Sequence, residues 1–76
     1  MTVEDLEAQT AALADEEAAL RDRLRALESE IHSVLRRDPH ANADAITERE
    51  KEIRRIVLRL VGIERERTEI QIAESL

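Results

Sequence analysis

The chain contains no cysteine and no aromatic residue, and among its 76 residues there is only one glycine and one proline. Without cysteine it has no disulfide, no thiolate metal site and no cysteine nucleophile. Without Phe, Tyr or Trp it has no aromatic surface for stacking a nucleobase and no cage for a quaternary ammonium. One glycine cannot build a phosphate-binding loop. We therefore expect no cofactor, no metal ion and no catalytic residue, and a protein that is not an enzyme.

Targeting and membrane-spanning signals are also missing. The first ten residues, MTVEDLEAQT, are acidic and lack the basic and then apolar regions of a signal peptide. No apolar run approaches the roughly 18 residues of a transmembrane helix. The residues that are present are 39% charged, with Ala, Glu, Leu and Arg prominent, which is typical of long helices. We expect one cytoplasmic domain, residues 1–76, that does not bind a membrane.

Aliphatic residues recur with a seven-residue period in the first half of the chain. One series begins at Val3 and a second begins three residues later at Leu6, and eight of their ten members are aliphatic. The ten positions are Val3, Leu6, Thr10, Leu13, Glu17, Leu20, Leu24, Leu27, Ile31 and Val34. They occupy the a and d positions of a coiled-coil heptad, so the spacing predicts a helix over about 2–37.

The second half repeats the period in a new phase. Six of nine positions are aliphatic in the set Ile46, Arg49, Ile53, Ile56, Leu60, Ile63, Arg67, Ile70 and Glu74. Pro39 disfavours helical backbone at Asp38, and Asn42 and Asp44 are both candidate N-caps. We expect a turn over about 38–42 and a second helix over about 42–75.

The two periods also predict how the helices pair. In an antiparallel pair with Ile46 opposite Val34, the two residues of every later layer lie equally far along the chain from residue 40, which is next to the only proline. This agreement predicts an all-α fold, an antiparallel two-helix coiled-coil hairpin. In its last layers an aliphatic residue faces a polar one, as with Ile63 opposite Glu17 and Leu13 opposite Arg67.

More apolar residues are present than two helices can bury against each other. Val57, Leu58 and Val61 point away from the predicted inter-helix core, and Gly62 costs about 1 kcal/mol in a helix interior unless it serves packing. Small residues of the first helix, Ala11, Ala14 and Ala18, form a ridge beside that core. We predict that these seven residues form an intermolecular interface. The partner is a second copy, giving a homodimeric four-helix bundle, or another helical protein.

Glu17 and Arg67 occupy core positions in adjacent layers of opposite helices. We expect a partly buried polar pair that fixes the register at some cost in stability. In an alternative interpretation they bind a charged ligand inside a bundle, together with Arg49, as in a small helical enzyme.

Charge is distributed unevenly. Residues 1–20 carry six acidic and no basic side chains, and residues 60–76 carry four acidic and two basic ones. Residues 21–59 carry ten basic and eight acidic side chains, a net charge of +2. Nucleic-acid binding is an alternative function, through Arg49, Lys51, Arg54, Arg55 and Arg59. A net charge of +2 does not favour it. Pairs along one helix, such as Glu50 with Arg54, explain the same residues as a solvated face.

In layout the chain is similar to three kinds of small helical hairpin. These are the RNA-binding dimers that control plasmid copy number, the co-chaperones of type III secretion needle subunits, and the coiled-coil factors that enter the secondary channel of RNA polymerase. The last carry acidic residues at the tip, where this chain has Asp38 and Asp44. The similarity covers architecture and no complete motif. It leaves an RNA-binding or transcription-regulating protein, or a subunit of a heteromeric helical complex, as alternatives to a non-catalytic scaffold, adaptor or co-chaperone.

Overall fold

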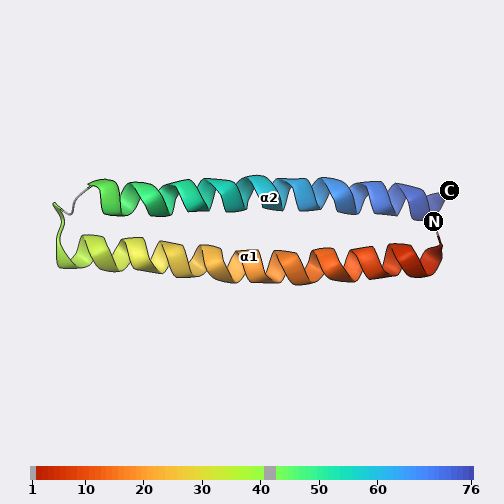
Figure 1. Ribbon diagram of the computed structural model, residues 1–76, viewed down its shortest axis with the longest axis horizontal. Helices are drawn as coiled ribbons and strands as arrows, with labels where there is room; N and C mark the ends of the chain where they lie inside the picture. The colour runs from red at the N-terminus through yellow and green to blue at the C-terminus, as the bar shows by residue number, and fades with distance from the viewer. Residues whose placement is uncertain (1, 41–42) are drawn as a thin grey trace.

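The chain folds as two long α-helices that lie antiparallel along their whole length (Figure 1). The computed structural model describes residues 2–40 and 43–76. Helix α1 spans Val3–Arg37 and helix α2 spans Ala43–Ser75, and the described residues include no strand. The hairpin measures 55 × 15 × 13 Å. This confirms an all-α helical hairpin, and each predicted helix start differs from the observed one by a single residue.

The ends of α1 follow from local side-chain chemistry. The Thr2 hydroxyl accepts a hydrogen bond from the Asp5 amide at 3.1 Å, and the Asp5 carboxylate accepts one from the Thr2 amide at 3.2 Å. This capping box satisfies amide groups that have no partner inside the helix. At the other end Asp38 is extended, with φ −145° and ψ 98°, as expected for a residue before proline.

Asp38 also shapes the turn. Its Oδ1 accepts a hydrogen bond from the His40 amide at 3.0 Å, two residues further on. Asp44 lies inside the first turn of α2, so the prediction that it is an N-cap was wrong. A carboxylate there still interacts favourably with the positive end of the helix dipole. The other predicted cap, Asn42, lies outside the described residues.

The inter-helix core follows the predicted heptads. The d positions are the most buried in both helices, and the buried residues are Leu6, Leu13, Leu27, Ile56, Ile63 and Ile70. Most a positions, such as Leu24 and Ile53, are half-buried because only one helix covers them. Leu6, Leu13, Ile63 and Ile70 form one cluster, against which Leu20 and Leu60 pack.

The hairpin has two halves along its length, one at the chain ends and one at the turn. We call residues 2–19 and 61–76 the open half, because α1 begins and α2 ends there (Figure 1). Residues 20–40 and 43–60 form the turn half. The cluster of four buried aliphatic residues lies in the open half, and Leu27 and Ile56 lie in the turn half. One narrow core therefore runs through both halves, and both sides of the hairpin remain open to solvent.

Candidate interaction surfaces

On one side of the hairpin, Arg59 of α2 forms an ion pair that joins the two helices. Its Nε and Nη2 donate to the two carboxylate oxygens of Glu16 on α1, at 2.6 and 2.7 Å, and its Nη1 donates to Glu66 at 3.0 Å. We call this side the clasp face. The hydrogen bonds from Arg59 lower the pKa of Glu16, and those to Glu16 and Glu66 raise the pKa of Arg59. Two carboxylates share one guanidinium, so the group of three side chains has a net charge of −1.

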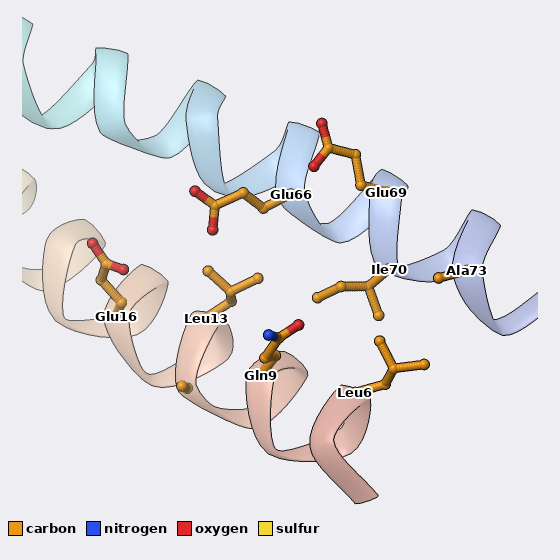
Figure 2. Close-up of a pocket in the computed structure, with 9 residues that line it drawn as sticks. Leu6, Gln9, Leu13, Glu16, Glu66, Glu69, Ile70 and Ala73 are labelled. Carbon is orange, nitrogen blue, oxygen red and sulfur yellow. The ribbon is translucent and has the colours of Figure 1, made fainter. Parts of the chain in front are cut away.

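An apolar groove opens on the clasp face in the open half (Figure 2). Its volume is about 490 Å³. Leu6, Leu13 and Ile70 lie between the helices at its floor, while Glu66 reaches from α2 toward α1 (Figure 2). The remaining lining residues are Gln9, Ala12, Glu16, Glu69 and Ala73. The groove has no polar group buried in its floor, so its chemistry is that of an apolar surface with carboxylates at its edges.

The opposite side, which we call the valine face, presents Val57 and Val61 of α2. These side chains are 44% and 54% exposed, and neighbouring Leu58 is 72% exposed. A shallow hollow of about 390 Å³ lies here. Its lining residues are Glu17, Arg21, Val57, Leu60, Val61, Glu64, Arg67, Thr68 and Gln71. The valine face is therefore apolar at its centre and charged at its borders.

The alanine ridge predicted on α1 lies on the valine face. Ala14 and Ala18 are seven and three residues before Arg21, which lines the hollow, and such spacings place residues on one side of a helix. Ala11 lies three residues before Ala14, about one helical turn earlier on the same side of α1, and all three alanines are exposed. Six of the seven predicted interface residues therefore lie on the valine face or at its border, where it meets the outer side of α2.

Gly62 is the exception among the predicted interface residues. A Cβ built on it would lie 3.7 Å from Nη1 of Arg59 and would meet nothing else within 4 Å. Gly62 therefore lies beside the clasp face, and no contact within the described chain requires a glycine there. Its role at a close approach between two molecules stays a prediction.

Glu17 and Arg67 do form the predicted ion pair. Nη1 of Arg67 lies 2.7 Å from Oε2 of Glu17, whose other oxygen accepts a hydrogen bond from Arg21 at 3.0 Å. The side chains of Glu17 and Arg67 are 21% and 38% exposed, so the pair is half-buried. A second helix covers only part of each side chain, and water reaches the rest.

Most of the candidate nucleic-acid contacts are used inside the chain. Arg49 donates to Glu30 of α1 at 3.1 Å, Lys51 donates to Glu48 at 3.3 Å, and Arg59 forms the clasp. Within the part of the chain that the structure describes, Arg54 and Arg55 have no ion pair. Three of these five cations are thus neutralised locally, which leaves two of the five for contact with a phosphate backbone.

Ion pairs between the helices were not predicted. Besides the clasp, Arg23 of α1 forms two hydrogen bonds to Glu52 of α2, at 2.9 and 3.1 Å. These bonds raise the pKa of Arg23 and lower that of Glu52. Arg23, Glu52, Glu16 and Arg59 all occupy the g positions that precede the a positions. Opposite charges at g positions of both helices were the signal that could have revealed them.

The described helices and turn include neither a metal-binding cluster nor a membrane-spanning segment. No group of three His, Asp or Glu side chains there is arranged to hold a metal ion. Neither of the two described helices has an apolar stretch long enough to cross a membrane. The chain matches no protein family, no curated protein and no solved structure.

Proposed function

We propose that this protein is a non-catalytic protein–protein interaction module that acts as a homodimer, with two hairpins forming a four-helix bundle through their valine faces. The observation that carries the proposal is the apolar centre of that face, where Val57 and Val61 remain exposed in the single chain, with exposed Leu58 at its border. A scaffold, an adaptor or a small co-chaperone each needs such a surface.

The accessible surface area supports self-association. The hairpin exposes 5886 Å², whereas a compact monomer of its 8.7 kDa mass exposes about 4,700 Å². The excess, roughly 1,200 Å², exceeds the approximately 800 Å² that each partner buries in an interface of standard size. Packing a second hairpin on the valine face would remove this excess and would cover a positions that are only half-buried.

Self-association also explains how a chain of only two helices can be stable. One core in a chain of this length rarely supplies more than about 3–5 kcal/mol of stability, so small scaffolds rely on oligomerisation, metals or disulfides. This chain has no cysteine, and no metal-binding group occurs among its described residues. Association is then the remaining source of stability.

The test replaces the centre of the valine face. Val57→Asp with Val61→Asp should halve the mass measured by light scattering, from about twice 8.7 kDa, because two carboxylates would have to be buried between the copies. Ala26→Asp with Ser33→Asp is the matched control, since both residues are exposed on α1 away from the valine face. An unchanged mass in the valine variant, or a monomeric parent protein, would refute the proposal.

A further inference from the structure

We propose that the two copies pack antiparallel, with α2 of one copy against α2 of the other, so that each turn end lies beside the partner's open end. This inference rests on the proposed self-association through the valine face and adds the orientation and the contacts. The occupant of the valine face is therefore a second copy in one defined orientation.

Two orientations satisfy a two-fold axis between stacked valine faces. An axis along the hairpin places α1 of one copy over α2 of the other, with both turns at the same end. An axis across the hairpin places α2 over α2 and the turns at opposite ends. Both arrangements give neighbouring helices that run antiparallel, so packing alone does not choose between them.

The side chains of α2 favour the second orientation. If two α2 helices cross at residue 59, Val57 meets Val61 of the second copy, because each lies two residues from that midpoint. Arg54 and Glu64 each lie five residues from the same midpoint, so Arg54 meets Glu64 of the second copy. The two-fold axis repeats both contacts, and an apolar centre is then flanked by an ion pair on either side.

Arg54 and Glu64 are available for this role. In the described chain neither side chain forms an ion pair of its own, and Glu64 lines the hollow of the valine face. Arg54 lies three residues before Val57, on the same side of the helix. An ion pair between the copies would satisfy both charges.

The other orientation would place two open halves side by side, and each carries ten acidic and only two basic side chains. The antiparallel orientation instead places each acidic open half beside a turn half of net charge +2.

A charge exchange tests the predicted contact. Arg54→Glu alone and Glu64→Arg alone should each raise the dimer dissociation constant by about tenfold or more, because two attractions become two repulsions. Mixing the two single variants should restore a dimer, and so should one chain that carries both changes. The mass measured by native mass spectrometry reports each result.

Matched variants on α2 separate this contact from a general charge effect. Arg55→Glu and Glu69→Arg alter the same kinds of charge in the same helix, and Glu69 lines the clasp-face groove instead. These controls should leave the dissociation constant within about twofold of the parent value. Single variants that dimerise normally, or a pair that does not restore the dimer, would overturn the orientation and leave the proposed self-association intact.

A distance measurement gives a second test. Because the chain has no cysteine, Ser75→Cys provides a unique position for a spin label at the exposed end of α2. With the α2 helices crossing at residue 59, the two labels lie about 48 Å apart, from 32 residues at 1.5 Å each. Turns at the same end would bring the labels within about 20 Å. The short distance refutes this orientation, and the loss of any dipolar signal refutes the dimer itself.

Discussion

The turn half and the open half of the hairpin have different predicted layers between the helices. In the turn half, aliphatic residues face each other in every layer except the one that contains Arg49. In the open half each layer pairs one aliphatic residue with a polar one, as with Ile63 and Glu17. Yet the cluster of Leu6, Leu13, Ile63 and Ile70 lies in the open half.

This comparison shows that long charged side chains can cover an apolar core in place of a second aliphatic residue. In the open half the stems of Glu17 and Arg67 reach between the two helices, and their ion pair holds the ends of both side chains. Burial in the open half therefore depends on charge, whereas burial in the turn half depends mainly on aliphatic contact. The predictions below test this difference.

The largest effect is expected for Ile63→Ala in the open half. Ile63 and Leu27 are both fully buried, and such truncations cost about 2–5 kcal/mol. We expect Ile63→Ala near the upper end of that range and Leu27→Ala near the lower end. Ile63 belongs to the aliphatic cluster of the open half, so its truncation removes contacts among several buried residues, whereas Leu27 lies outside that cluster. Urea unfolding followed by circular dichroism gives both values.

An exposed residue provides the control for that measurement. Ile72→Ala should change the free energy of unfolding by less than about 0.5 kcal/mol, because Ile72 is exposed on α2. If Leu27→Ala costs as much as Ile63→Ala, the two halves respond alike and the contrast between their cores is wrong.

Acid should weaken the ion pairs that hold both halves. Arg59 lowers the pKa of Glu16, and Arg23 lowers the pKa of Glu52, from an ordinary value of 4.5. A lowered pKa contributes stability above the ordinary value, and that contribution is lost as the pH falls through the lowered value. The melting temperature should therefore be nearly constant down to about pH 5 and should decline below 4.5.

Single variants show how much each half contributes to the fall in melting temperature at low pH. Glu16→Gln and Glu52→Gln should each make the melting temperature less dependent on pH. Glu16→Gln should remove the larger part, since Arg59 then keeps only Glu66. A melting curve that shifts with acid equally in the parent protein and in both variants would assign the response to other carboxylates.

The smallest effect is expected when the open half is made to resemble the turn half. Glu17→Leu with Arg67→Leu replaces a half-buried ion pair with two aliphatic residues, and such exchanges are commonly neutral or stabilising. The melting temperature should stay constant or rise, and it should be less sensitive to salt. A large fall in the melting temperature would mean that the ion pair stabilises the hairpin by more than the packing of its aliphatic side-chain stems.

The heptads and the single proline were enough to predict the two helices, their antiparallel arrangement and the buried d positions. Local chemistry fixed those features, because Pro39 ends α1 and the aliphatic period allows one helical face inward. The contacts of the charged residues were less predictable. Glu52 lies three residues before Arg55 on its own helix, yet it pairs with Arg23 on the other, and the relative rotation of the helices decides between the two partners.

The interaction surfaces were predicted in part. Exposure of Val57, Leu58 and Val61 followed from their positions outside the heptad core. The place of Gly62 beside the clasp face depends on where the Arg59 side chain turns, which the residue pattern does not encode. The same uncertainty in side-chain direction hid the apolar groove next to Glu66.

Because α1 starts and α2 ends at the same end of a rod 55 Å long, a group fused to either helix end would lie at that one end. A fluorescent protein fused before α1 or after α2 would occupy one end and leave the turn unobstructed. Two hairpins packed antiparallel would hold groups fused to their helix ends at opposite ends of the assembly, and helix length alone would set the distance between these groups.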